Sequence, residues 1–438
     1  MTDQTFENIN TALDAVENPM MNYNFKSPLL SSVDISIPVF EKRVGETSAS
    51  AMIPTDGFVA YQIITVTKSK PKNSGFELNA YDDDEGQSCT LEKQWVVWRR
   101  YRNFELLRGH LEATYPYIII PPLPEKSFSY GWQKVSSEKL SSDFLERRRV
   151  SLIRFLHHVA EHPVLSNDKT FLAFLQNENW MNTTKNMDAF GKASQTLRSL
   201  HASYRLKMPD RFFEETKCFA DGNHSVISSL LHVRTKIAGR EFGIHKLHAN
   251  YGRVFREMSS FQNTASEEFQ TVARYMDIYA AGIDTMLEEE ENIIDKMKEY
   301  MTYMEAVRNV CCQQELIQFQ YEQLESSIHS KESQRKQIST GDHTSSIFLL
   351  IGRSTMNQDN KLQALDRDIQ QLETQMQLLI GENKSFKQKA QEDIKRFHQQ
   401  KEHFLQEAMF GLAVHRIQTY RKNLALWLKL QECFSKIQ

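Results

Sequence analysis

Three consecutive residues, Arg99, Arg100 and Tyr101, carry side chains that suit a phosphorylated ring. An arginine presents a planar fork of donors that matches phosphate oxygens in pairs, and a tyrosine ring can stack on a flat ligand. A stiff proline segment follows along the chain and ends in Lys126. The combination predicts a pocket for a small, multiply phosphorylated ring, and the inositol headgroup of a membrane lipid fits that description.

A fourth basic residue is expected in the same pocket. Asp143 and Glu146 form a D-x-x-E pair, which predicts the start of a helix. The apolar face of that helix is formed by Leu152, Phe155 and Val159. Extending this face backwards by one turn reaches Arg148, so we expect Arg148 to point inward near the helix N-terminus, where anions are favoured.

The two arginines alone are also compatible with the solvated end of a strand. The presence of Lys126 and Arg148 favours the pocket, with Arg100 as the phosphate ligand and Arg99 as a structural or peripheral residue.

The elements that position these residues form a small α+β unit. Alternation of apolar and polar residues over 33–39 predicts a half-buried strand with Val33, Ile35, Ile37 and Val39 inward. Pro38 places this strand at a sheet edge, because proline cannot donate a ladder hydrogen bond. Further antiparallel strands are expected over 58–68 and 95–100, and the unit is expected to close near Trp180.

Long helices are predicted beyond Pro209, the last proline of the chain. Apolar residues recur there in alternating steps of three and four, which is typical of a coiled-coil seam. The seam of the second helix is Val272, Met276, Tyr279, Ile283, Met286, Ile293, Met297, Tyr300, Met304, Val307 and Cys311, interrupted at Glu290, and that of the third helix is Leu362, Leu365, Ile369, Leu372, Met376 and Leu379. The first helix, over about 223–262, is less regular. We expect three antiparallel helices and a dimer held by these seams, so that charge at Met297 and Met304 would disrupt it.

Length, charge and composition limit the classes of protein to which the chain can belong. The 438 residues suggest two or three domains, and a formal net charge of −3 argues against an extended nucleic-acid binder. The five cysteines include no CxxC pair, so neither a zinc site nor a disulfide framework is indicated. We find no signal peptide and no apolar run long enough to span a membrane, so a cytosolic protein that reaches membranes from outside is expected.

Several segments leave two interpretations open. Residues 181–208 are amphipathic and basic, which fits either membrane insertion or docking on the protein itself. Phe128, Tyr130 and Trp132 either dip into a bilayer interface or pack within their own loop. The apolar run at 347–351, within the connection 339–358, either inserts in membrane or packs on a neighbour. The acidic run 288–291 is interpreted as a solvated face.

Three motifs in order, RRYRNFELL, PPLPEK and FLERRR, resemble those of a PX domain, and the long helices behind them look like a BAR domain. Over roughly residues 33–438 the chain is similar to the PX–BAR sorting nexins. The expected organisation is a disordered N-terminus at 1–30, an α+β PX domain with a three-stranded antiparallel sheet plus helices at 31–180, an amphipathic linker at 181–208, and an all-α three-helix BAR coiled-coil domain at 209–438.

The resemblance implies roles for four residues. Arg100 would hold the 3-phosphate of phosphatidylinositol 3-phosphate, and Tyr101 would stack under the inositol ring. Lys126 would pair with the 1-phosphate, and Arg148 would bond the ring hydroxyls. This lipid marks early endosomes.

The resemblance further implies a non-enzymatic adaptor on the cytosolic face of early endosome membranes. It would sense or induce curvature as a homodimer, or as a heterodimer with a related PX–BAR sorting nexin, and support cargo recycling and autophagy together with cargo receptors. No cofactor and no nucleic acid are expected. The alternative is a coiled-coil scaffold whose PX domain binds proteins.

Neither a metal site nor a catalytic site is expected. His158 and His162 share a helical face, but no third ligand is evident, so we expect them at the surface. The stretch 81–92 has EF-hand spacing, yet it begins with Tyr81, which cannot serve as the first ligand. No Gly-rich phosphate loop and no G-x-S-x-G elbow occur in the sequence.

Overall fold

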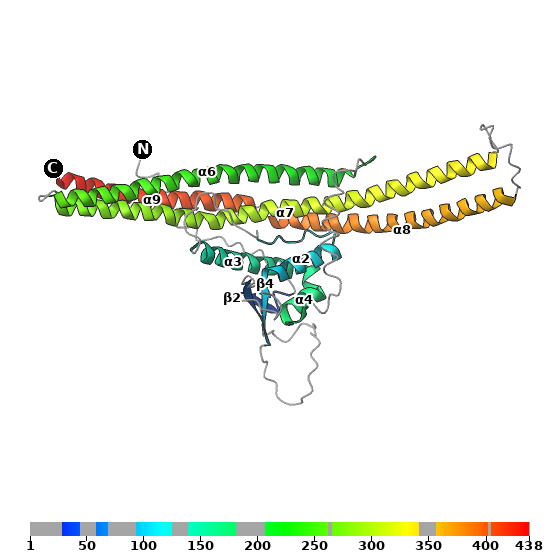
Figure 1. Cartoon of the computed structure of the whole chain (residues 1–438), viewed down its shortest axis with the longest axis horizontal. Coiled ribbons are helices and arrows are strands. Elements are labelled where there is room, and N and C mark those ends of the chain that lie inside the picture. Colours follow the sequence, from blue (N-terminus) through cyan, green and yellow to red (C-terminus); the bar gives the residue numbers. More distant parts are fainter. Residues whose placement is uncertain are drawn as a thin grey trace, which may run out of the picture.

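The computed structural model describes residues 29–43, 58–68, 93–124, 139–180, 206–261, 265–340, 356–401 and 404–437. These residues form a small α+β unit and a long helical bundle (Figure 1). The α+β unit lies against the middle of the elongated bundle, and side chains of α3 contact α7 there. The predicted fold class, an α+β domain followed by an all-α domain, is confirmed.

The sheet is built around one long strand. Strand β3 (Phe58–Thr67) pairs antiparallel with β4 (Gln94–Arg100) on one side, and with β1 (Val33–Ser36) and β2 (Phe40–Arg43) on the other. The strand predicted over 33–39 ends at Ser36 and does lie at the sheet edge. Strand β2 is a further strand beyond Pro38, so the described sheet has four strands where three were expected. Val33, Ile35 and Ile37 are buried as expected, whereas the inward position predicted for Val39 is wrong, because this side chain is 45% exposed.

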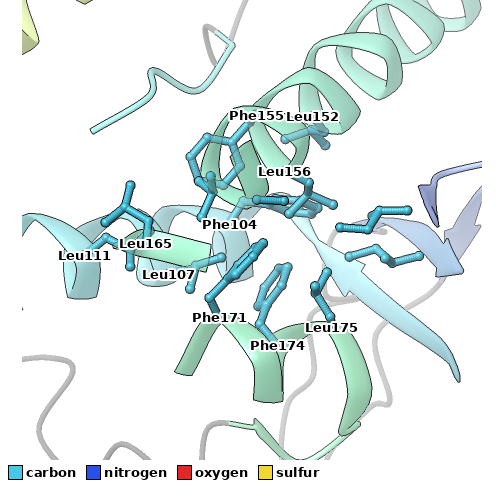
Figure 2. Packing of buried hydrophobic residues seen from close by; sticks show 14 of the residues in the cluster. Phe104, Leu107, Leu111, Leu152, Phe155, Leu156, Leu165, Phe171, Phe174 and Leu175 are labelled. Atoms are coloured by element: carbon cyan, nitrogen blue, oxygen red, sulfur yellow. The ribbon is translucent and has the colours of Figure 1, made fainter. Parts of the chain in front are cut away.

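Helices cover the inner face of the sheet. They are α2 (Tyr101–Thr114), α3 (Lys139–Glu161), the short 3₁₀ helix η1 (Leu165–Asn167) and α4 (Lys169–Gln176). Their buried faces meet in one aromatic and aliphatic core, in which Phe104 packs edge-on against Phe155 and Phe174 (Figure 2). Trp180 closes this core and is 1% exposed.

Helix α3 begins earlier than predicted. Its first residue is Lys139 and not Asp143, so the expected start signal at Asp143 and Glu146 is wrong. Arg148 therefore lies in the third turn of the helix, beyond the reach of the free N–H groups of the first turn. The predicted apolar face is confirmed, since Leu152, Phe155 and Val159 are all buried.

The bundle consists of α6 (Arg211–Phe261), α7 (Ser266–Thr340), α8 (Met356–Lys401) and α9 (Phe404–Ile437). Helix α7 runs through its centre and packs against the other three, so α8 and α9 together take the place of the third predicted helix (Figure 1). Met297 and Met304 are 0% and 1% exposed within the core of this single chain. The expectation that they hold a dimer together is therefore wrong, because the chain buries them by itself.

The acidic run at 288–291 is only partly solvated. Glu290 and Glu291 are 0% and 6% exposed, so the solvated face predicted for the whole run is wrong. Glu290 occupies the gap in the α7 seam and accepts from Arg416 of α9 at 3.0 Å, with Arg234 of α6 also 3.0 Å away. Buried carboxylates require such partners, because an unpaired charge inside a protein is costly.

Some expectations concern residues outside the described ranges. They include the prediction of disorder at 1–30, nearly all of the linker 181–208, and the connection between α7 and α8. The predicted boundaries of the domains stay predictions.

Candidate functional site

The end of β4 brings two of the predicted pocket residues to the start of α2. Arg100 precedes the first turn of α2, and its backbone N–H donates to Oδ1 of Asn103 at 2.9 Å. The Arg100 side chain is exposed, with its guanidinium carbon 5.6 Å from the centre of the Phe58 ring. The geometry leaves this guanidinium available to a ligand arriving from solvent.

Arg148 reaches the same place from α3. Its guanidinium carbon lies 4.7 Å from the centre of the Tyr101 ring and 4.2 Å from that of the Phe144 ring. The structure thus joins Tyr101 and Arg148 directly, with Arg100 one residue before Tyr101. Arg148 is inward-facing as predicted, but it is held by the aromatic rings and not by a helix N-terminus.

Tyr101 is fixed at both ends of its side chain. The ring contacts Arg148, and the hydroxyl donates to the carbonyl oxygen of Pro124 in the proline segment. Burial, together with the nearby Glu105 carboxylate, raises the pKa of Tyr101 to about 12. The tyrosine is therefore neutral at physiological pH and presents an uncharged ring beside the guanidinium of Arg148.

Arg99 has a structural position. It is 2% exposed, and its guanidinium donates to the carbonyl oxygens of Phe174 at 2.8 and 3.1 Å and of Glu178 at 3.3 Å. These carbonyls lie at and just beyond the end of α4, where a cation satisfies groups that the helix leaves without partners. Burial lowers the pKa of Arg99 to about 10. Arg99 ties β4 to α4, which agrees with the structural role expected for it.

The remaining predicted site residues, Lys126, Phe128, Tyr130 and Trp132, lie outside the described residues. A cavity of about 40 Å³ lies near the proline segment, between Pro122, α3 and α7. It has room for a few water molecules but not for a lipid headgroup. The candidate pocket is therefore the solvent-facing surface around Arg100, Tyr101 and Arg148, and not this cavity.

A second surface with a functional character runs along α6 and α9. Nine apolar side chains of α6 are 38–85% exposed and lie three, four or seven residues apart, as on one face of a coiled coil: Val226, Val233, Ile237, Ile244, Leu247, Tyr251, Val254, Met258 and Phe261. We call this set the α6 seam. The α9 seam has the same spacing and comprises Phe410, Ile417, Tyr420, Leu424, Trp427 and Phe434, each 40–59% exposed.

The two seams lie on neighbouring helices. Helices α6 and α9 meet at the ion pair between Glu241 and Arg416 and at the ring contact between His248 and Trp427, whose centres are 6.0 Å apart. An apolar surface of this extent on an isolated chain indicates a protein interface.

The histidines lie between the α+β unit and the bundle and not at the surface as expected, with His162 buried and His158 half-buried. His162 is 4% exposed; its Nδ1 accepts from the backbone N–H groups of Val164 and Leu165, so its Nε2 carries the proton and donates to Oδ1 of Asp393 at 2.9 Å. His158 is hydrogen-bonded to the Tyr303 hydroxyl at 2.9 Å. Both join the α+β unit to the bundle. Among the described residues, no group of three or more His, Cys, Asp or Glu side chains could hold a metal ion.

Two sets of interface residues were not predicted from the sequence. The α6 seam was missed because the first helix looked irregular, although its apolar residues keep heptad spacing from Val226 to Phe261. The second set is a polar stripe on α3, formed by Arg147, Arg154 and His158, which faces the bundle. Its i, i+7, i+11 spacing was the available signal for a second buried face.

No helix within the described part of the chain has both the length and the apolar character that crossing a membrane requires.

The chain is similar to known proteins over nearly its whole length. The PX domain family model matches residues 87–178. Sorting nexin-4 of cattle (Bos taurus) is 37% identical over 96% of this chain and 90% of its own length, and sorting nexin-4 of human (Homo sapiens) is 37% identical over 93% of this chain and 88% of its own length. Sorting nexin-30 of zebrafish (Danio rerio) is 24% identical over 77% of this chain and 70% of its own length. The chain therefore belongs to the sorting nexin family.

Proposed function

We propose that this sorting nexin recognises phosphatidylinositol 3-phosphate through Arg100, Tyr101, Arg148 and Lys126. The supporting observation is the contact between Arg148 and the Tyr101 ring, one residue from the exposed guanidinium of Arg100. An aromatic ring in contact with one guanidinium group, next in sequence to a second and exposed guanidinium, suits a sugar-like ring that carries phosphate. In this arrangement Arg100 holds the 3-phosphate, Tyr101 stacks under the ring and Arg148 bonds the ring hydroxyls.

The second part of the proposal concerns the dimer. The α6 and α9 seams form the surface that a second sorting nexin chain covers, either a second copy or a related PX–BAR sorting nexin. Two heptad seams on adjacent helices are a surface that a partner of the same kind can match, since coiled-coil helices pack seam against seam. The elongated bundle then becomes half of a longer assembly with two lipid pockets.

Membership of the sorting nexin family and the PX domain support a lipid-binding role in endosomal sorting. The finer proposal is a non-enzymatic adaptor on early endosomes. It senses or induces curvature as a BAR dimer and supports cargo recycling and autophagy. Two weak membrane contacts in one dimer multiply avidity, so neither pocket has to bind tightly alone.

Liposome flotation tests this proposal. The full chain should float with vesicles that contain phosphatidylinositol 3-phosphate and stay at the bottom with otherwise identical vesicles that lack it. Equal recovery from both would favour the alternative, a coiled-coil scaffold whose PX domain binds proteins. Recovery that depends on the net charge of the vesicle alone would contradict recognition of the 3-phosphate.

A further inference from the structure

Two faces of helix α3 make contacts with other elements. One face, with Leu152, Phe155 and Val159, packs in the core of the PX domain. A second stripe contacts α7 of the bundle: Arg154 pairs with Glu299 at 3.1 Å, and His158 is hydrogen-bonded to Tyr303 at 2.9 Å. The helix that supplies Arg148 to the pocket is therefore also part of the domain interface.

The strongest contact of that stripe is one residue away from the pocket. Arg147 donates to Oδ2 of Asp295 from Nη2 at 2.5 Å and from Nε at 2.9 Å, and its Nη2 is also 3.3 Å from the carbonyl oxygen of Glu291. The side chain of Arg147 is 17% exposed and that of Asp295 is 7% exposed. A paired, charge-assisted contact with little solvent around it holds a helix more firmly than an exposed ion pair does.

Consecutive residues therefore point in two directions. Arg147 reaches into the bundle, while Arg148 covers the Tyr101 ring at 4.7 Å. Successive side chains on a helix are about 100° apart, so neither can shift along or around the helix axis without moving the other.

A second wall of the pocket is anchored in the same way. Ile119 is 2% exposed and belongs to the core of the bundle, and its N–H donates to Oδ2 of Asp393 in α8 at 2.8 Å. The proline segment starts two residues later and supplies the Pro124 carbonyl that accepts from the Tyr101 hydroxyl. The next residues along the chain lead to Lys126.

We propose that the bundle positions the lipid pocket, with Arg147 and its partner Asp295 acting as positioning residues for Arg148. The inference rests on the proposed lipid recognition and adds a dependence of that recognition on the bundle. The PX domain and the bundle then act as one unit in headgroup binding.

If charge alone determined headgroup affinity, the substitution Asp295→Asn would change that affinity in the direction opposite to the one that a positioning role predicts. Asp295→Asn removes a negative charge from the neighbourhood of the pocket, which by Coulomb attraction alone would tighten binding of an anionic headgroup. If Asp295 positions α3, the same change loosens Arg147 and weakens binding. The direction of the change therefore separates the two explanations.

The experiment is calorimetric titration of the full chain with soluble, short-chain phosphatidylinositol 3-phosphate. We expect Asp295→Asn and Arg147→Ala each to weaken binding by roughly two- to thirtyfold, the range found when residues remote from a ligand alter its affinity. Arg149→Ala is the matched control. Arg149 lies on the same helix and loses the same charge, but it pairs with Glu146 and with the carbonyl of Ile37 inside the PX domain.

The inference would be overturned if Asp295→Asn bound the lipid as tightly as the unmodified chain or more tightly. It would also be overturned if Arg149→Ala lost as much affinity as Arg147→Ala. Melting temperatures of the same samples show whether each variant is folded. If Asp295→Asn does not fold, the double variant Arg147→Asp with Asp295→Arg, which exchanges the two charges, replaces it. We expect this double variant to recover lipid affinity relative to Arg147→Ala. A loss of affinity equal to that of Arg147→Ala would overturn the inference. Failure of the unmodified chain to bind the lipid would instead refute the proposed function.

Discussion

Leu247 lies near the middle of the α6 seam and is 60% exposed. We predict that Leu247→Ala weakens the dimer and that Leu247→Glu makes the chain monomeric at micromolar concentration. The physical reason is that a partner chain covers this side chain in the dimer, whereas the single chain leaves it in water.

The size of the effect follows from the exposed fraction. Complete burial of a leucine side chain stabilises by about 2 kcal/mol, so covering 60% of Leu247 contributes roughly 1.2 kcal/mol. A symmetric dimer contains the residue twice, so Leu247→Ala should cost about 2.4 kcal/mol, or roughly fiftyfold in the dissociation constant. Leu247→Glu adds the cost of burying two unpaired carboxylates and should have a larger effect.

Sedimentation velocity over a range of concentrations measures this dissociation constant. Met297→Ala is the control, because Met297 is 0% exposed inside the chain. It should lower the melting temperature through the cavity that it creates and leave the dissociation constant of the folded protein unchanged. A Leu247→Glu protein that dimerises as well as the unmodified chain would refute the assignment of the interface. An unmodified chain that stays monomeric would exclude a second copy as the partner and leave the related sorting nexin.

Two further predictions concern buried polar groups. Glu290→Ala should destabilise the bundle by about 3–5 kcal/mol, because it leaves Arg234 and Arg416 without their shared partner, and chemical denaturation would measure the loss. An unchanged midpoint would show that the remaining partners, Glu241 for Arg416 and Glu291 for Arg234, or water satisfy both arginines. Burial lowers the pKa of His162, although Asp393 opposes the shift, so the unfolded chain takes up a proton that the folded chain does not. Stability should therefore fall as pH drops below about 6.5, by up to about 1.4 kcal/mol per pH unit for this residue. Melting temperatures at pH 7.5 and 5.5 should differ less for His162→Gln than for the unmodified chain, and an equal difference would remove His162 as the cause.

The elements that could be predicted from the sequence are those governed by local periodicity. Alternation identified β1, the strands β3 and β4 were predicted close to their observed bounds, and the apolar face of α3 was predicted correctly. The basis is physical, since these side chains must be buried and their spacing follows directly from strand or helix geometry. Arg148 was placed correctly by the same rule, even though the start of its helix was not.

Errors arose where burial depends on partners distant in sequence. The α7 seam gives no sign that α6, α8 and α9 of the same chain cover it, so Met297 was assigned to the dimer. Glu290 was predicted to be solvated because its partners Arg234 and Arg416 belong to two other helices. His162 looks exposed because its partner Asp393 belongs to α8. Composition and periodicity cannot supply contacts of this kind.

One titration tests whether Arg100 holds the 3-phosphate. Soluble phosphatidylinositol 3-phosphate is titrated into the full chain, into Arg100→Ala and into Arg102→Ala, which removes an equal charge from an exposed position two residues away. Charge-assisted bonds contribute about 1.5–3 kcal/mol each, so losing the paired bonds of Arg100 should cost roughly 3–4 kcal/mol, or about a hundred- to a thousandfold in affinity. Arg102→Ala should bind nearly as well as the unmodified chain. Equal binding by the unmodified chain and Arg100→Ala would contradict the pocket assignment.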